Sequence, residues 1–294
     1  MSAGVLTRGA ASISGALGRE GSTRPAALIR IGFMFLLWTS LTFPTSAFKW
    51  LDRPLLATCC LVLSVASVTL FVGFVSRISA LLVALTSFII CWWFGAMEGV
   101  REFQGMTGVW LTAALLPALP VGGSFSVDRL LAVRRARRRG EESPPERAPI
   151  WGLYLIRLQL SAIYCFAAFD KIDPEWLDGE RLERLVLNFY GYAELLRDQP
   201  WIHVGCVALA WFTTLTEFSL GVLVWHRPLR RFILPLGIIL HMGFFVLLAL
   251  WPLSQRMVLL YLAFLDPDDV HRLTDNLLRP HDPHEVGSGS AERG

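Results

Sequence analysis

Long apolar segments alternate with short polar connections along most of the chain. A helix of about 20 residues crosses the ~30 Å hydrocarbon core of a bilayer, so apolar segments of about this length are read as transmembrane. The pattern predicts an all-α fold, a polytopic membrane bundle of seven to eight transmembrane segments. The seven firm segments are residues 26–43, 55–75, 78–97, 107–121, 150–169, 202–225 and 232–251.

The apolar stretch after the seventh segment is too short to be assigned in the same way. Residues 257–265 are followed directly by the polar sequence DPDD. Three interpretations stay open: a half-helix, a re-entrant piece, or a short span that continues from Leu253. The fourth segment is also short, and it contains Pro117 and Pro120.

Polar flanks divide the chain into three parts. Residues 1–25, rich in Ser, Gly, Ala and Arg, are expected to form a flexible cytoplasmic N-terminus without a cleaved signal peptide. Residues 26–265 form the transmembrane domain, which includes a basic cytoplasmic linker at 124–149. Residues 266–294 form a polar C-terminal tail, which we expect to be disordered beyond Arg279.

The charge distribution sets the expected orientation and partners. Charged residues make up 17% of the chain, against about 25% in soluble proteins, which favours a membrane protein. Seven arginines lie between the fourth and fifth segments and three more in HRPLRR, so the positive-inside bias places both loops in the cytoplasm. We expect an integral protein of a bacterial inner membrane, with membrane lipids as partners. A nucleic-acid partner is not expected, because the basic run is short and flanked by spans.

The fifth segment carries polar residues that are costly inside a bilayer. Arg157, Tyr164 and Lys171 recur every seven residues and therefore share one helical face. Only two of the 27 basic residues are lysines, Lys49 and Lys171. Lysine can lose its proton and arginine cannot, so the choice of lysine at the outer end of this segment points to chemistry there.

Glu217 is a carboxylate within the sixth segment. Inside a membrane it must be paired or protonated, and Arg157 or Arg30 is the natural partner. We expect a structural ion pair between Arg157 and Glu217.

The loop beyond Lys171 is the long outer connection of the chain. Pro174 should end the fifth helix at or before Asp173, because proline disfavours helix in the residue ahead of it. Residues 182–190 have apolar positions at helical spacing. They predict a short amphipathic helix that lies on the membrane surface or caps a cavity.

Three blocks resemble the HTTM (horizontally transferred transmembrane) domain family, which is related to the membrane part of vitamin K-dependent gamma-carboxylase. SVDRLL at 126–131 resembles the family's S-x-D motif. RLQLSAIYCFAAFDKIDPEWLDG at 157–179 resembles its aromatic-rich helix that ends K-x-D-x-x-W-x-x-G. TEFSLGVLVWHRPLRR and LHMGFFVLLALWPLSQRMVLL resemble the family's glutamate-containing and histidine-bearing helices. The resemblance covers most of the chain from about Arg30 to Leu265.

The resemblance implies catalytic roles for Lys171 as base and His241 as auxiliary group. In the carboxylase, the lysine at this place deprotonates vitamin K hydroquinone. Oxygenation then generates a base that removes a proton from the γ carbon of a glutamate, and carbon dioxide is captured. The implied cofactor is a reduced, vitamin K-like quinone, although the residues alone identify no cofactor, and no metal site is expected. The candidate cofactor-binding residues are Arg157, Tyr164, Trp176 and Glu217.

Each catalytic candidate also has a structural interpretation. An apolar boundary destabilises the Lys171 ammonium and makes a neutral amine available, but the same lysine can extend to the interface and pair with Asp170, Asp173 or Glu175. His241 can donate to a quinone oxygen or relay a proton, or it can hydrogen-bond a neighbouring helix.

Two departures argue against ordinary glutamate carboxylation. The carboxylase has an outer histidine before its fourth helix, where this chain has REFQGMTGVW at 101–110. The carboxylase also continues into a large lumenal domain that holds its protein substrate. The sequence therefore favours a carboxylase-like catalyst or binder of a reduced quinone. The alternatives are a non-enzymatic membrane protein that matures or handles a partner peptide, and a transporter.

Overall fold

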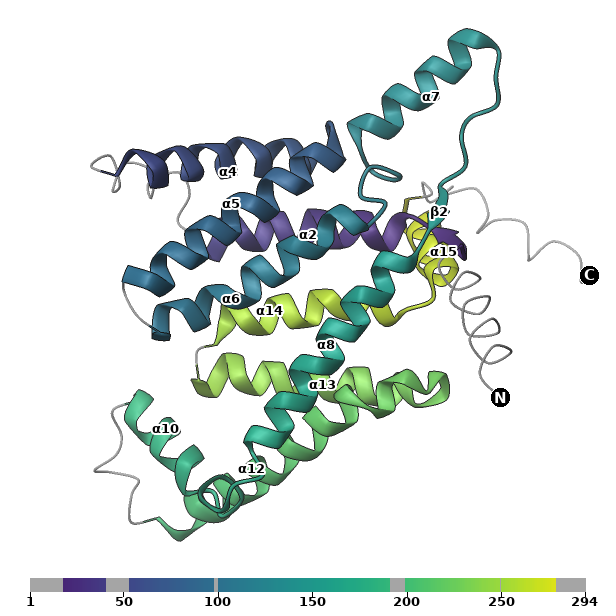
Figure 1. Cartoon of the computed structure of the whole chain (residues 1–294). Helices are drawn as coiled ribbons and strands as arrows, with labels where there is room; N and C mark the ends of the chain where they lie inside the picture. The colour runs from purple at the N-terminus through teal and green to yellow at the C-terminus, as the bar shows by residue number, and fades with distance from the viewer. Residues whose placement is uncertain (1–17, 41–52, 98–99, 191–198, 249, 279–294) are drawn as a thin grey trace, which may run out of the picture.

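The computed structural model describes residues 18–40, 53–97, 100–190, 199–248 and 250–278. Within these ranges the chain is almost entirely helical, which confirms the all-α membrane bundle (Figure 1). The helices are α2 (Arg24–Ser40), α4 (Pro54–Val72), α5 (Ser76–Met97), α6 (Val100–Leu115), α7 (Val127–Arg139), α8 (Trp151–Asp170), α9 (Pro174–Leu177), α10 (Glu180–Tyr190), α12 (Pro200–Gly221), α13 (Arg227–Leu248), α14 (Trp251–Leu260) and α15 (Pro267–Leu278), and the 3-10 turns are η1 (Leu116–Ala118), η2 (Leu223–Trp225) and η3 (Tyr261–Phe264).

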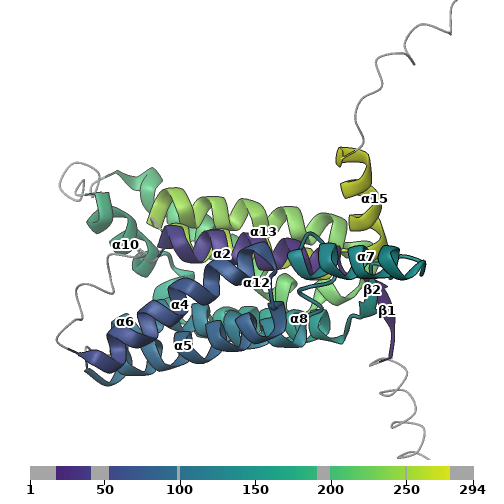
Figure 2. The same cartoon turned by 90° about the horizontal axis from the view of Figure 1, so that it is seen from above.

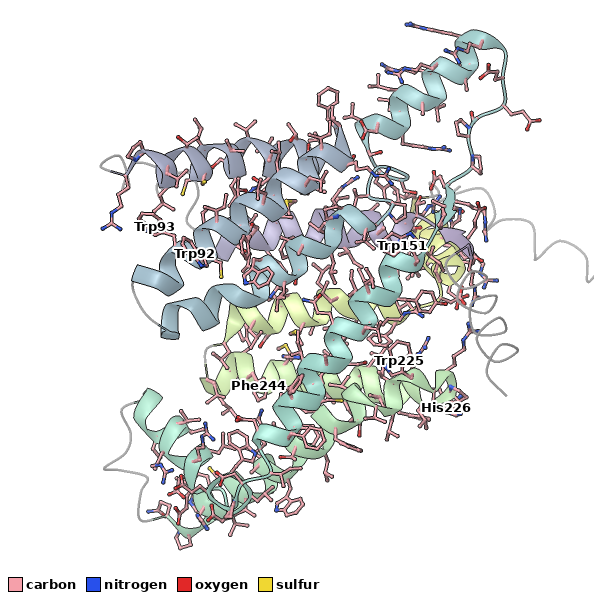
Figure 3. All side chains as sticks on the ribbon, viewed as in Figure 1. Trp92, Trp93, Trp151, Trp225, His226 and Phe244 are labelled. Carbon is pink, nitrogen blue, oxygen red and sulfur yellow. The ribbon has the colours of Figure 1, made fainter. Side chains whose placement is uncertain are left out.

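The long helices run between two ends of the bundle and alternate in direction along the chain (Figure 1). One end holds α7, α15 and the first turn of α13. We call it the basic end, because α7 and the first turn of α13 carry exposed arginines. The opposite end holds α9 and α10. Trp151 and Trp225 lie toward the basic end, and Trp92 and Trp93 toward the opposite end (Figure 3). Tryptophans near both ends fit the two interfaces of a membrane.

Five described helices are long and apolar enough to cross a membrane: Pro54–Val72, Ser76–Trp93, Trp151–Asp170, Pro200–Gly221 and Arg227–Leu248. Their outward side chains are exposed apolar residues such as Phe166 at 75%, and lipid would cover them. The other predicted segments correspond to shorter helices, which include Gly108–Ala118 and Leu253–Phe264.

Two segment boundaries differ from the prediction. The fourth segment forms α6 from Val100 onward and ends at Leu115, because Pro117 cannot continue the regular helix and the chain tightens into η1. The stretch of uncertain length is continuous from Trp251 to Phe264 as α14 and η3. Its continuity favours the third interpretation, a short span that continues from Leu253, although the helix begins two residues earlier, at Trp251.

The S-x-D motif joins α7 to the turn between α4 and α5. The Ser126 hydroxyl caps α7 by accepting a hydrogen bond from the Arg129 N–H at 3.0 Å. The Asp128 carboxylate accepts from the N–H groups of Val75 and Ser76, each at 2.8 Å, and from the Ser76 hydroxyl at 2.7 Å. Burial alone would raise the pKa of Asp128, but these hydrogen bonds outweigh it and hold the pKa below its ordinary value.

The segment expected to be a flexible lead is structured from Glu20 onward. Strand β1 (Glu20–Ser22) pairs antiparallel with β2 (Arg147–Pro149), which lies at the end of the basic linker. Next to it the Arg24 side chain donates to Glu146 at 2.9 Å and forms an ion pair with Asp275 of α15 at 2.7 Å. These contacts tie the three polar parts of the chain together at the basic end.

The polar C-terminal tail begins with the helix α15. Figure 2 shows that α15 lies across the direction of the bundle helices. Its Pro267 and Val270 are buried, whereas Leu273 and Leu277 are 58% and 75% exposed. The predicted disorder beyond Arg279 falls on residues 279–294, which lie outside the described residues.

The predicted amphipathic helix of the outer loop is α10. Its Leu182 and Leu187 pack with Trp176 of α9 and with Ile202 of α12 in a small apolar cluster, separate from the main core. Leu182 also lines a cavity of about 140 Å³ beside α12 and α13. Of the two expected placements, the structure therefore favours the helix as a cap over a cavity.

Candidate functional site

The polar stripe of α8 faces the interior of the bundle, as its seven-residue spacing predicts. Arg157 and Tyr164 are buried, and Ser161 and Ala168 lie on the same face. Lys171 follows the last residue of α8 directly and keeps helical backbone angles, so its side chain continues the stripe. Pro174 begins the short helix α9 beyond it.

Lys171 forms an ion pair with Glu217 of α12. The amine Nζ lies 2.9 Å from Oε2 and donates to Oε1 at 3.1 Å, and it also donates to the Ala167 carbonyl at 3.2 Å. Oε2 itself accepts no hydrogen bond of good geometry among the described residues. The Trp176 ring centroid lies 5.2 Å from Nζ, within range of a cation–π contact. The structure therefore brings Lys171, Glu217 and Trp176 together.

This pairing corrects two predictions from the sequence. Glu217 pairs neither with Arg157 nor with Arg30, and the described partner of Lys171 is none of the neighbouring acids of its own loop. The reason is the close approach of α8 and α12 at Gly221, where an added Cβ would lie only 2.6 Å from Cys165 Sγ. Glu217 is one helical turn from this contact, so its carboxylate faces the end of α8.

Arg157 and Arg30, the two expected partners of Glu217, bind backbone carbonyls instead. Arg157 Nε donates to the Ala263 carbonyl at 2.6 Å, and its guanidinium lies 4.6 Å from the Tyr154 ring centroid. Arg30 donates to the carbonyls of Val121 and Phe125 in the loop before α7. Fourteen residues separate Arg157 from Lys171, about 21 Å along a helix, so the structure does not bring Arg157 to the lysine.

Tyr164 links two other helical segments through one hydroxyl. Its Oη lies 2.7 Å from Nε2 of His241 on α13 and 2.6 Å from Oη of Tyr261 in η3. Gly237 gives this cluster room, because a Cβ there would lie 2.4 Å from the Tyr261 hydroxyl. All three polar side chains are buried.

Sequence reasoning missed Tyr261. The signal was a single hydroxyl in the otherwise apolar run MVLLYLAF, in a segment whose length gave no clear assignment. Glu217 lies within electrostatic range of both tyrosines. The buried polar side chains thus form two groups, Lys171 with Glu217 and Tyr164 with His241 and Tyr261.

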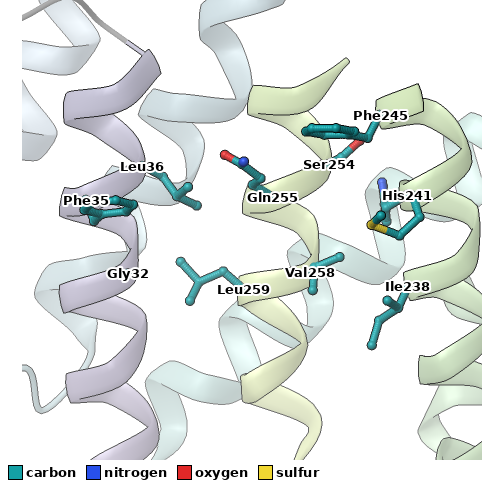
Figure 4. A pocket seen from close by; sticks show the side chains of 11 residues that line it. Gly32, Phe35, Leu36, Ile238, His241, Phe245, Ser254, Gln255, Val258 and Leu259 are labelled. Carbon is teal, nitrogen blue, oxygen red and sulfur yellow. The ribbon is translucent and has the colours of Figure 1, made fainter. Parts of the chain in front are cut away.

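His241 also borders a cavity of about 400 Å³ between α2, α13 and α14 (Figure 4). Its Nδ1 has no hydrogen-bond partner among the described residues, and the same holds for the buried hydroxyl of Ser254 on the cavity wall. The rest of the wall is mainly apolar, with Phe35, Ile238 and Val258 among its residues. An apolar ligand with one or two polar atoms fits such a site. In the described ranges no group of three or more His, Cys, Asp or Glu side chains is placed to hold a metal ion.

A family model described as the HTTM domain matches residues 37–268. The chain belongs to the HTTM-domain family. The matched region of this HTTM-domain protein contains Lys171, Glu217, His241 and Tyr261. Comparisons with curated proteins and with solved structures found no match. Family membership and the long apolar helices identify an integral membrane protein in contact with lipid.

Proposed function

We propose that this HTTM-domain protein binds a reduced, quinone-like lipid in the His241 cavity and accepts a proton from it. The observation that carries the proposal is the position of His241. His241 lines an apolar cavity, its buried Nδ1 has no described partner, and its other ring nitrogen is hydrogen-bonded to Tyr164. A ligand hydroxyl against Nδ1 would complete the hydrogen bonding of the ring. The volume of about 400 Å³ suits a substituted aromatic ring and the start of a prenyl chain.

The proton acceptor in this proposal is the Lys171–Glu217 pair. Lys171 can act as a base only when its amine is neutral, which places the proton that the two groups share on the Glu217 carboxyl. Moving the proton between the two partners changes the charge of both. In this proposal the hydroxyls of Tyr164 and Tyr261, which are hydrogen-bonded to each other and through Tyr164 to His241, take part in the proton transfer.

The carboxylase-like form of the proposal assigns one role to each residue. Lys171 is the base, His241 is the auxiliary group that contacts the ligand oxygen, and Tyr164 orients the imidazole. Glu217 and Trp176 hold the amine in place. The deprotonated hydroquinone would then react with oxygen and give a stronger base, which would take a proton from a peptide or protein partner. Arg157 has no role in this step, because it lies far from Lys171 and binds the Ala263 carbonyl.

A non-enzymatic membrane protein that handles a partner peptide is the second candidate. It is favoured by the close pairing of Lys171, whose charge the Glu217 carboxylate already balances. In that case the ion pair only fastens α8 to α12, and Lys171→Arg would leave function unchanged.

The location in a bacterial inner membrane, with the basic end in the cytoplasm, is also part of the proposal. It is supported by the exposed arginines of α7 and of the first turn of α13. Single cysteines at Arg138 and at Asp178 provide a test in a background without the natural cysteines. A membrane-impermeant thiol reagent added to intact cells should label Asp178→Cys and leave Arg138→Cys unlabelled. The reverse result would refute the orientation.

The experiment for ligand binding is mass spectrometry of lipids that co-purify with the full-length protein. We expect a quinone in the wild-type preparation and its loss in His241→Leu. The matched control is His203→Leu, because His203 is exposed and its partner among the described residues is Glu183, at the other end of the bundle. A preparation without any quinone, combined with no binding of an added reduced naphthoquinone, would contradict the proposal.

A further inference from the structure

A second hollow lies at the basic end of α13, apart from the polar cluster of Tyr164. Its volume is about 530 Å³, and it lies between the first turns of α13 and the connection from η3 to α15. Charged side chains line one part of the hollow, and apolar side chains line the other part. Its lining includes Arg227, Arg230, Arg231, Pro235, Ile238 and Phe264.

The three arginines of this hollow differ in what they bind. Arg230 donates to the carbonyls of Val224 at 2.8 Å and Phe264 at 2.9 Å, so its guanidinium is held by the backbone. Arg227 and Arg231 are exposed, and neither forms an ion pair with a carboxylate in the described part of the chain. Two guanidinium groups one helical turn apart are therefore available to an anion.

The acidic residues of the hollow are occupied elsewhere. Asp269 forms an ion pair with Arg272 one turn further along α15. Asp266 accepts a hydrogen bond from the Asp268 N–H at 3.1 Å at the start of the same helix. The Asp266 carboxylate keeps its charge and acts on Arg230, so the net charge of the hollow is positive and is carried by Arg227 and Arg231.

The hollow and the His241 cavity are neighbours along α13, since Ile238 lines both. Ile238, Met242 and Phe245 are exposed and follow one another along the same side of α13. From Arg231 to His241 the helix rises by about 15 Å, a distance that an acyl chain can span. A groove with cationic groups at one end and apolar walls beyond them has the polarity of a phospholipid.

We propose that this groove binds one phospholipid with a net negative headgroup. Its phosphate lies against Arg227 and Arg231, because a guanidinium can bind phosphate oxygens with two parallel hydrogen bonds. One acyl chain follows Pro235, Ile238 and Met242 toward the His241 cavity. This lipid is distinct from the quinone-like ligand, and its site does not depend on the proposed proton transfer.

The test measures which phospholipids the full-length protein retains from nanodiscs of mixed phosphatidylglycerol and phosphatidylethanolamine, by native mass spectrometry. The wild-type protein should be enriched in phosphatidylglycerol. The double variant Arg227→Gln/Arg231→Gln should lose this enrichment roughly 30-fold, the effect expected for two basic residues near an anionic surface. The matched control is Arg134→Gln/Arg135→Gln, which removes the same charge from exposed residues of α7 at the same end.

A third variant tests the acyl chain. Ile238→Trp fills the groove and leaves both arginines in place, so it should also lose the bound lipid. Inorganic phosphate should not displace the lipid, because the apolar walls contribute to binding. Equal loss in the α7 control would show a general charge effect and overturn the site. Equal retention of both phospholipids by the wild-type protein would do the same.

Discussion

The Lys171 amine and the Glu217 carboxylate meet at 2.9 Å, and they join the end of α8 to the C-terminal part of α12. Both side chains are largely withdrawn from the surface, with 15% and 4% of their area exposed. A buried ion pair holds two charges that have lost most of their hydration, so the removal of one partner leaves the other uncompensated. The catalytic interpretation of Lys171 requires an amine that can lose its proton, whereas the structural interpretation requires only its positive charge.

The variant Lys171→Arg should keep the ion pair with Glu217, but it should no longer have an amine that can act as a base. Arginine preserves the positive charge but does not deprotonate in proteins, so the rate of proton removal from a reduced quinone should fall about 10²- to 10⁴-fold. The melting temperature should stay close to that of the wild-type protein. The two measurements are hydroquinone consumption under oxygen and thermal unfolding in detergent. An unchanged rate in a folded variant would favour the non-enzymatic function.

Glu217→Gln should destabilise the protein by about 3–5 kcal/mol, because it leaves the Lys171 charge without its partner. Thermal or denaturant unfolding in detergent provides the measurement. The double variant Lys171→Met/Glu217→Leu should recover part of this loss, since no uncompensated charge remains. The control is Glu175→Gln, whose pair with Arg184 is exposed and worth about 0–1 kcal/mol. A loss in Glu217→Gln as small as in this control would contradict the structural importance of the pair.

Gly237→Ala should destabilise the tyrosine cluster. The new Cβ would lie 2.4 Å from the Tyr261 hydroxyl, so Tyr261 must shift and weaken its hydrogen bond with Tyr164. We expect a cost of about 1–3 kcal/mol, typical of overpacking. Gly243→Ala is the matched control on the same helix, where no atom lies within 4 Å of an added Cβ. It should be neutral or stabilising by up to about 1 kcal/mol.

Stability should depend on Asp128 below about pH 4. The hydrogen bonds from Ser76 and Val75 hold the pKa of Asp128 below its ordinary value of about 3.9. Its contribution to stability is therefore complete above that value, and it is lost as the pH falls through the lower pKa of the folded state. Thermal unfolding of the wild-type protein and of Asp128→Asn between pH 3 and 7 should show curves that converge at the acidic end. Parallel curves over the whole range would contradict this.

The helices and the buried face of α8 could be predicted from the sequence, because apolar length and the seven-residue spacing are local properties. The partner of Glu217 could not, since it depends on which helices approach closely. The contact of Gly221 with Cys165 that sets this approach has no periodic signal. The strands β1 and β2 could not be predicted either, because each has only three residues, too few for an alternating pattern. Tyr261 belongs to a segment too short to be recognised by its length.

The hydroxyl that Tyr164 shares between His241 and Tyr261 carries only one hydrogen. If Tyr164 donates it to Nε2, a neutral imidazole holds its own hydrogen on Nδ1 and presents a donor to the cavity. If Tyr164 donates it to Tyr261 instead, the imidazole hydrogen lies on Nε2 and Nδ1 presents a lone pair. The two states differ both in the direction of the Tyr164 hydrogen and in the imidazole tautomer, and in the proposed site the first suits a quinone carbonyl and the second a hydroquinone hydroxyl. One set of side chains can thus hold both oxidation states of the same ligand.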